Sequence, residues 1–462
     1  MTQITAAGLT LELASDGPLT RRLVTALRDA VRDGSLSAGT ALPPSRLLAA
    51  ELGCSRWVVT EAYGQLVAEG YLQATTGAAT TVREIGGATP LRPLGIPAAR
   101  PQPRYDLTPG VPDLAGFPRT RWLEAYRRAV LARPTGLMAD RSPIGTIAAR
   151  AVLTDYLVRT RQVREDPTQV AVTTGSGASV GWLSRVLAGI GHRRVGVEDP
   201  SWPGLRDAAS RAGLAVVPIG VDQHGLRVAD LDQHPDVRVV ICTPAHQFPL
   251  GVPLSPDRRV ELIKWAERVG GVIIEDDYDA EFRYDRSPVG SLQGMAPDRV
   301  VLVGSVSKTL GPMINLGWVI MPQWLIMRIL AGDLDAGIGS SVFGLEAFAT
   351  MISEGWYERH LRTTRTRLRS RRERLVAAAT KMLPDCPLSG MPAGMHLVMK
   401  LPDAVDEAAV VRRAAAHEVG VVSLDRYRLE AEPTAALVIG FGNLRDGCEA
   451  EAVERLAAAI RK

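Results

Sequence analysis

The sequence predicts an α/β protein: a small, mainly helical domain at the N-terminus precedes a larger domain built on a mostly parallel sheet. Residues 18–69 repeat apolar side chains at helical spacing between glycine breaks. Residues 237–277 alternate apolar runs with an amphipathic stretch, which is typical of βαβ units. Between them, residues 85–104 contain five prolines and three glycines and should form an extended linker. We therefore expect domains at 1–84 and 105–462.

The N-terminal domain should contain three helices. The first covers residues 18–33, where leucine and valine recur at helical spacing. Ser45 is expected to cap a second helix, which breaks at Gly53. Ser55 is expected to cap a third helix over residues 56–69. Two short helices around a glycine turn form a helix-turn-helix.

A hairpin wing is predicted after these helices, over residues 71–82. The run LPPSRLLAAELGCSRWVVTEAYGQLVAEGYL resembles the GntR-type winged helix-turn-helix, and the similarity covers about residues 18–83. The resemblance implies that the domain binds double-stranded operator DNA. It also implies the residues that face DNA, namely Arg46, Ser55, Arg56, Thr60 and the wing around Gly77.

Two features of this domain differ from that pattern. Residues 1–84 contain seven arginines and eight acidic residues, whereas nucleic-acid binders usually have a basic face. Trp57 stands where the family more often has a small polar residue. The alternative for this domain is a helical oligomerisation module.

In the large domain, polar residues follow two apolar runs that fit buried strands. Val272–Ile274 leads into Asp276 and Tyr278, and residues 300–303 lead into Ser305, Ser307 and Lys308. Open α/β sheets bind ligands at the carboxyl ends of their strands, so these side chains should meet at one site.

This set of side chains suits pyridoxal phosphate. Lys308 would form the Schiff base, and Asp276 would pair with the protonated pyridine nitrogen. Tyr278 would donate to the phenolic oxygen, and Ser305 and Ser307 would bind the phosphate. The alternative is two ordinary core strands with polar ends and a surface lysine. Because the chain prefers arginine to lysine elsewhere, lysine at 308 favours the functional interpretation.

Three other segments add candidate residues. Ser176 and Gly177 lie in a Gly-Ser-Gly turn before a predicted helix, where free N–H groups and the helix dipole favour an anion. Trp202 follows a predicted strand and would either stack on a flat ring or pack in the core. His246, just past another strand, would contact the cofactor or order its loop.

The large domain resembles fold-type I aminotransferases, and the whole chain resembles the MocR branch of the GntR regulators. The motifs are VTTGSGAS, EDPSWPG, TPAHQFPLG, IIEDDYDAEFRY, GSVSKTLGP, EGWYERHLR and VIGFGNL, in this order. The resemblance implies a mostly parallel sheet with a smaller C-terminal α+β lobe, and a homodimer. It assigns Lys308, Asp276 and Tyr278 the roles given above, Trp202 to stacking, and four residues to the phosphate: Ser176, Gly177, Ser305 and Ser307.

Two departures from this family bear on activity. Asn315 stands where such domains usually place a phosphate-binding arginine, a charge-assisted contact worth roughly 1.5–3 kcal/mol. The segment around Val438 lacks the arginine with which aminotransferases hold a substrate carboxylate. Ordinary amino-acid turnover is therefore not expected.

Composition narrows the class of protein further. The net charge of +4 indicates no particular partner. The four cysteines are scattered without ligand spacing, so we expect neither disulfides nor a metal site. The N-terminus has no signal-peptide pattern, and no apolar run is long enough for a membrane span. A cytoplasmic, nucleoid-associated protein is expected.

Together these features predict a transcription regulator that binds DNA and pyridoxal phosphate. Its aminotransferase-like domain would sense the cofactor, or an adduct with an amino acid, in control of vitamin B6 or amino acid metabolism. One alternative is an active aminotransferase with an accessory N-terminal domain. Another is a regulator whose pocket has lost the cofactor, for which Asn315 is the support.

Overall fold

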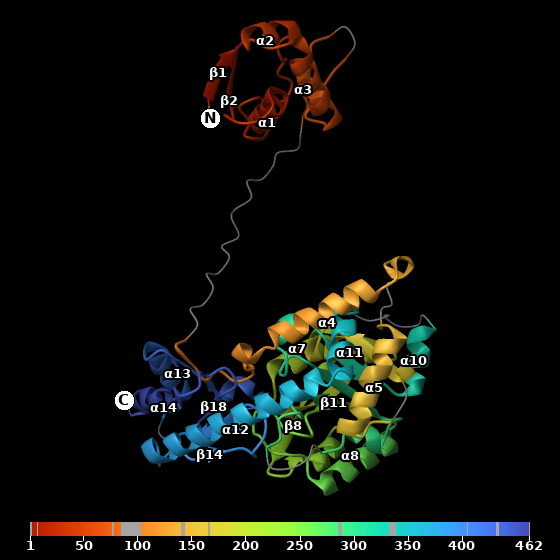
Figure 1. Cartoon of the computed structure of the whole chain (residues 1–462), viewed down its shortest axis with the longest axis vertical. Coiled ribbons are helices and arrows are strands. Elements are labelled where there is room, and N and C mark those ends of the chain that lie inside the picture. The colour runs from red at the N-terminus through yellow and green to blue at the C-terminus, as the bar shows by residue number, and fades with distance from the viewer. Residues whose placement is uncertain are drawn as a thin grey trace. The chain divides into compact units, whose positions relative to one another are not determined.

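The computed structural model describes residues 2–6, 8–75, 78–84, 103–139, 144–164, 167–284, 289–331, 339–403, 405–430 and 434–461. The chain separates into two compact units, residues 1–100 and 101–462. Figure 1 shows both units. Most of the predicted linker lies outside the described residues.

The N-terminal unit contains the predicted helices and wing. Helices α1 (Leu19–Arg32), α2 (Ser45–Glu51) and α3 (Arg56–Ala68) are followed by the antiparallel pair β3 (Leu72–Gln73) and β4 (Thr81–Val82). A preceding hairpin, β1 (Thr2–Ala6) with β2 (Leu9–Leu13), was not anticipated. The core is aliphatic, because Leu23, Leu27, Leu48 and Leu66 are fully buried.

The expected capping was wrong at one position. Pro44, not Ser45, precedes the first turn of α2, and Ser45 is the first helical residue. The Ser45 hydroxyl instead accepts a hydrogen bond from Arg56 Nε at 3.3 Å, which links α2 to α3. Ser55 does hold the N-cap position of α3, but its side chain makes no capping hydrogen bond.

An eight-stranded sheet forms the centre of the large unit. Its order is β6 (Val170–Thr173), β13 (Gly317–Ile320), β12 (Val300–Ser305), β11 (Val272–Asp277), β10 (Val239–Cys242), β7 (Arg194–Asp199), β8 (Ala215–Asp222) and β9 (Gly225–Leu226). The pairs from β12 through β8 are parallel, whereas β13 runs antiparallel to both of its neighbours. The mostly parallel sheet is confirmed.

Successive residues of a strand point to opposite faces of a sheet. The strands of this sheet are apolar on both faces, and helices cover both. On β11, Val272 and Ile274 pack in the core under α6 (Ser176–Gly189), α7 (Pro203–Arg211) and α10 (Gln323–Leu330). Ile273 packs on the other face, with α8 (Pro256–Val269) and α9 (Leu292–Met295). Helices α5 (Ile147–Arg161) and α11 (Val342–Ser353) cover that second face farther along the sheet, and α4 (Arg119–Ala132) packs on α11.

The C-terminal lobe is a smaller α+β layer. Its antiparallel sheet has the order β14 (Leu388–Ser389), β15 (His396–Lys400), β18 (Ala436–Gly440) and β17 (Val422–Ser423). Helices α12 (Trp356–Met382), α13 (Glu407–Ala416) and α14 (Glu449–Ile460) pack with it, and β16 (Val419–Gly420) pairs with β5 (Tyr105–Asp106). Figure 1 shows α12 running along this lobe and the neighbouring α/β layers.

Short 3-10 turns complete the described chain: η1 (Leu114–Gly116), η2 (Thr135–Leu137), η3 (Pro167–Gln169), η4 (Val228–Gln233), η5 (Pro312–Ile314) and η6 (Leu424–Tyr427). Among the helices of the described ranges, none has the length and apolar character needed to cross a membrane.

Candidate functional site

A cavity of about 460 Å³ lies where the strands of the large sheet end. Its walls come from residues just past the carboxyl ends of β6, β7, β10, β11 and β12, together with Thr108–Gly110 and parts of the C-terminal lobe. This is where open α/β sheets bind ligands. Eight of the residues predicted for the cofactor line it: Ser176, Gly177, Trp202, Asp276, Tyr278, Ser305, Ser307 and Lys308.

Lys308 lines the cavity together with these residues. Its Nζ donates a hydrogen bond to the carbonyl of Gly110 at 2.5 Å. Burial lowers the pKa of Lys308, and the nearby carboxylates of Asp279 and Asp276 oppose that shift. A larger fraction of the amine is then neutral, which is the form that attacks a carbonyl.

Asp276 presents an unsatisfied oxygen beside the cavity. The residue is 4% exposed, and its Oδ1 has no hydrogen-bond partner among the described residues. Burial raises the pKa of Asp276 to about 7, and a hydrogen bond from Ser176 opposes the shift. A buried acceptor without a partner is costly, so this oxygen suits a ligand that brings a donor or a cation.

The turn before α6 forms an anion cradle. Ser176 is the first residue of α6, and its hydroxyl oxygen lies 3.4 Å from Ser305 Oγ. Gly175 has φ +134°, which favours glycine, and a Cβ there would lie 3.7 Å from Ser307 Oγ. The first N–H groups of a helix have no partner within it. Three hydroxyls and these amides therefore converge on one place.

Trp202 lies open to the cavity and is 44% exposed, which excludes the alternative that it is a core residue. Its ring edge comes within 3.4 Å of the position that a Cβ on Gly177 would take. Glycine at 177 thus leaves room for the indole of Trp202 beside the first turn of α6.

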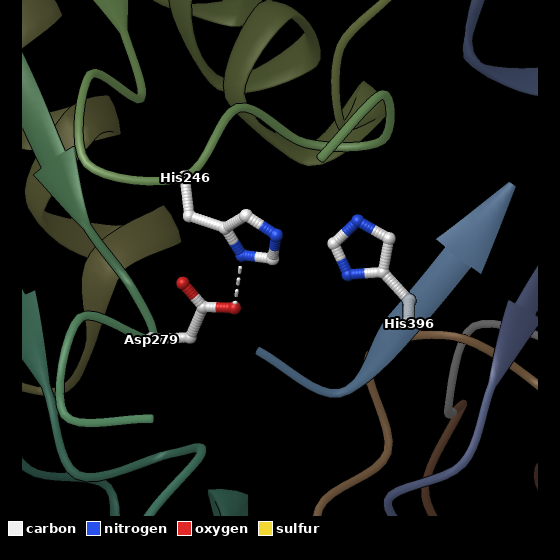
Figure 2. A group of neighbouring side chains, drawn as sticks. All are labelled: His246, Asp279 and His396. Carbon is white, nitrogen blue, oxygen red and sulfur yellow. Dashed lines mark hydrogen bonds and ion pairs between the residues drawn. The ribbon is translucent and has the colours of Figure 1, made fainter. Parts of the chain in front are cut away.

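His246 does not line the cavity; it lies one layer behind Tyr278. Its Nδ1 contacts Asp279 Oδ2 at 2.8 Å and the Tyr278 hydroxyl at 3.1 Å. Figure 2 shows His396, from β15, facing the opposite side of the ring. One ligand atom from each of His246, Asp279 and His396 lies within 4.8 Å of the other two. No local pattern in the sequence predicted this cluster, because His396 comes from the distant C-terminal lobe.

The two departures from the family pattern lie away from the cavity. Asn315 is exposed, has φ +50° and is not part of the cavity lining. Val438 is fully buried in β18 and also does not reach the cavity. Sequence reasoning did not identify Arg426 of η6, which does line it. An isolated arginine in an irregular segment carries no pattern that would have singled it out.

On the N-terminal unit, the residues predicted to face DNA are exposed: Arg46, Ser55, Arg56 and Thr60. They lie on α2 and at the start of α3, the two helices of the helix-turn-helix. Trp57 joins this surface and is 66% exposed. Gly77 lies outside the described residues.

The fold and the cavity define an aminotransferase-like domain, preceded by a helix-turn-helix. Residues 106–456 match the family described as aminotransferase class I and II, and residues 19–82 match the bacterial regulatory proteins of the gntR family. The chain is 30% identical to the probable rhizopine catabolism regulatory protein MocR of Rhizobium meliloti, over 98% of this chain and 96% of that protein. The chain belongs to the MocR-type transcription regulators of the GntR family.

A second relative has a similar span. The HTH-type pyridoxine biosynthesis transcriptional regulator PdxR of Corynebacterium glutamicum is 32% identical, over 91% of each chain. Among solved structures, the kynurenine aminotransferase of Pyrococcus horikoshii superposes with a TM-score of 0.69 at 22% identity, covering 77% of this chain and 90% of that chain. An archaeal alanine:glyoxylate aminotransferase reaches a TM-score of 0.70 at 22% identity, with the same two coverages. These structural similarities establish the fold.

Proposed function

We propose that this protein regulates transcription by binding DNA through α2 and α3, and that its large domain binds pyridoxal phosphate in the cavity around Lys308. The cofactor, or its adduct with an amino acid, acts as the effector. The observation that carries this proposal is the meeting of Lys308, the unsatisfied Asp276 oxygen and the serine cradle in one cavity. The cytoplasm, on the nucleoid, is the proposed site of action.

The residues of the cavity fit this cofactor. Asp276 suits the cationic ring nitrogen, which would give its orphan oxygen a partner. Tyr278 suits the phenolic oxygen, and Trp202 the face of the ring. Ser176, Gly177, Ser305 and Ser307 suit the phosphate. When bound, pyridoxal phosphate supplies an electrophilic aldehyde and an electron-withdrawing ring. Lys308, with its lowered pKa, is the amine that would hold it covalently.

The regulatory role is favoured over aminotransferase activity by the C-terminal lobe. Val438 and its neighbours in β18 are buried and apolar, so this strand offers no guanidinium to a substrate carboxylate. The relative named for pyridoxine biosynthesis supports vitamin B6 control as the first regulon to examine. Arg426 on the cavity wall offers a cation to an effector with an anionic group.

The first experiment is an absorbance titration of the full-length protein with pyridoxal phosphate, for wild type and for Lys308→Ala. A visible band in wild type that is absent from Lys308→Ala is expected. The absence of a band in both would mean that the pocket no longer binds the cofactor. DNA affinity with and without cofactor then tests the coupling, because an effector must favour one DNA-binding state over another. Unchanged affinity, footprint and transcription would rule out the coupling.

Steady turnover of an amino acid with a keto acid would support the enzyme alternative instead. This assay uses the same cofactor-loaded protein, with Lys308→Ala as its control. We expect no sustained turnover, because no arginine occupies the usual carboxylate-binding position around Val438.

We also propose a homodimer, which would present two DNA-binding domains to one operator. Its support is the outward face of α4, where Leu123 and Leu131 are each 70% exposed. The opposite face of α4 buries Ala125 and Ala129. An apolar surface of this kind is typical of a protein interface.

A further inference from the structure

The proposed function leaves one buried polar cluster without a role. His246, Asp279 and His396 lie beside Tyr278, and their side chains are 2–3% exposed. Figure 2 shows the His246 ring between Asp279 and His396, with the dashed contact running to Asp279. His246 does not line the cavity, whereas Tyr278 does, so any effect of His246 on a ligand has to pass through its neighbours.

The contacts of His246 define which of its nitrogens carries the proton. Asp279 Oδ2 lies 2.8 Å from Nδ1, and a carboxylate accepts hydrogen bonds. Nδ1 therefore carries the hydrogen. Nε2 is buried and has no partner among the described residues, so a second N–H there would be left unsatisfied. When the ring carries one hydrogen, these contacts place it on Nδ1.

The same N–H reaches the Tyr278 hydroxyl at 3.1 Å. Since Nδ1 is a donor, the Tyr278 oxygen is the acceptor in this contact. Burial, the Asp279 charge and a hydrogen bond to Asp279 raise the pKa of Tyr278 well above its usual value, so the hydroxyl keeps its proton. That proton can turn from Asp279 to a ligand oxygen when a ligand enters the cavity. Asp279 thus fixes His246, and His246 fixes the direction in which Tyr278 can donate. This orientation matters because Tyr278 lies on the wall that it shares with Asp276 and Lys308.

The surroundings prevent the His246 ring from turning. A Cβ on Gly394, which has φ +63°, would lie 2.2 Å from His246 Cε1 and 2.5 Å from Asp279 Oδ2. On the other side the ring of His396 lies 4.9 Å away, centroid to centroid, and its Nε2 donates to the Pro249 carbonyl at 3.1 Å. Burial lowers the pKa of His396 well below its usual value, so this second ring is neutral.

We propose that His246 and Asp279 are a positioning pair that aims the Tyr278 hydroxyl into the cavity, toward the ring oxygen of the bound cofactor. This inference rests on the proposed binding of pyridoxal phosphate. Tyr278 is the residue that donates to the ligand, and His246, which does not line the cavity, acts through it. Asp279 holds His246 in place and also borders the cavity.

The test is a pyridoxal phosphate titration of full-length variants, read as the dissociation constant and as the pH dependence of the visible band. His246→Leu removes the donor, and His246→Asn places an amide N–H near the position of Nδ1. We expect His246→Leu to weaken binding by about 3- to 10-fold, the effect of one lost hydrogen bond, and to shift the pH profile. His246→Asn should recover most of both changes. His224→Leu, an exposed histidine elsewhere in the large unit, should behave as wild type.

A double-mutant cycle separates positioning from packing. In a Tyr278→Phe background, His246→Leu should cause no further change, because the hydroxyl through which it acts is gone. An unchanged pH profile in the single variant, or an equal loss in both backgrounds, would overturn the proposal. Loss of the band from wild type after metal chelation would also overturn it, since the cluster would then hold an ion. No band in untreated wild type would instead remove the proposed function, and this inference with it.

Discussion

Asp276 and Asp277 are adjacent on β11, yet their carboxylates have different surroundings. Successive side chains of a strand point to opposite faces. Asp276 borders the cavity with one oxygen unsatisfied, whereas both oxygens of Asp277 bind Arg161, at 2.5 and 2.7 Å. One carboxylate is thus left for a ligand, and the other is used to attach α5 to the sheet.

Trp57 is a second residue whose position suggests a role. It is the only tryptophan in residues 1–100, and it lies 66% exposed between Arg56 and Thr60 along α3. Covering an exposed indole with DNA removes apolar surface from water and so stabilises the complex, for example through contact with a thymine methyl group.

We therefore predict that Trp57→Ala weakens binding to a DNA fragment selected with the wild-type protein by about 10-fold or more. Fluorescence anisotropy with labelled DNA measures this. Trp324→Ala, at another partly exposed tryptophan of the large unit, is the control and should bind normally. Equal affinity of Trp57→Ala and wild type would place Trp57 outside the interface.

Glu198 makes stability depend on pH. Burial raises the pKa of Glu198 to about 7 from 4.5, despite hydrogen bonds from Thr243 and Gln247. The folded state then binds the proton more tightly than the unfolded state. The stabilising contribution is present below pH 4.5 and is lost as the pH rises through about 7.

Glutamine cannot ionise, so Glu198→Gln should not lose this contribution. Its unfolding free energy, relative to that of wild type, should therefore rise as the pH is raised from 5 to 8. The gain is at most about 3 kcal/mol, since one pKa unit is worth about 1.36 kcal/mol. Urea unfolding at both pH values measures it. Glu454→Gln, at an exposed position of α14, is the control and should show no such trend. A pH-independent difference for Glu198→Gln would contradict the prediction.

At the scale of elements, α5 is tied to β11 by the Arg161–Asp277 pair. Both side chains are nearly inaccessible, at 3% and 7% exposure, and Arg161 Nη1 also donates to the Val289 carbonyl. Breaking such a pair leaves a buried charge without a partner. This contact keeps the start of the DDYD segment, and hence Asp276 and Tyr278, in place.

We predict that Arg161→Met lowers the unfolding free energy of the large unit by about 3–5 kcal/mol. Replacing both partners, with Arg161→Met and Asp277→Leu together, should be less harmful than Arg161→Met alone. Denaturant unfolding followed by circular dichroism measures the change. Arg159→Met is the matched control on the same helix; its ion pair with Glu358 is solvent-exposed and should contribute less than about 1 kcal/mol. Equal losses for the two arginines would show that burial is not the cause.

At the scale of the whole molecule, the dimer that we propose would use the exposed face of α4. Leu123 and Leu131 project from a helix whose other face is packed on α11. Figure 1 shows α4 along the outside of the large unit. A dimer through this face would remove apolar surface from water, which favours association.

Leu123→Asp combined with Leu131→Asp should shift the full-length protein from dimer to monomer, because each charge would be buried in the interface. Sedimentation velocity measures the shift. Val260→Asp, at a partly exposed position of α8, is the control and should remain dimeric. A double variant that stays dimeric would place the interface elsewhere.

Local sequence patterns predicted the helix-turn-helix, the mostly parallel sheet and the set of polar residues around Lys308, but not the β1–β2 hairpin. These follow from local patterns: helical spacing, apolar runs, and polar residues at strand ends such as Ser305 and Lys308. Such patterns can be recognised in a sequence because each involves only residues that are close together along the chain.

Which distant side chains meet became known from the packing of the folded chain. It brought His396 and Arg426 from the C-terminal lobe to the cavity wall, placed His246 behind Tyr278, and turned Asn315 away from the lining. These positions depend on how the C-terminal lobe packs against the large sheet. That packing cannot be predicted from the spacing of apolar residues along the chain. The lysine-centred set could therefore be predicted from the sequence, whereas the side chains that support it could not.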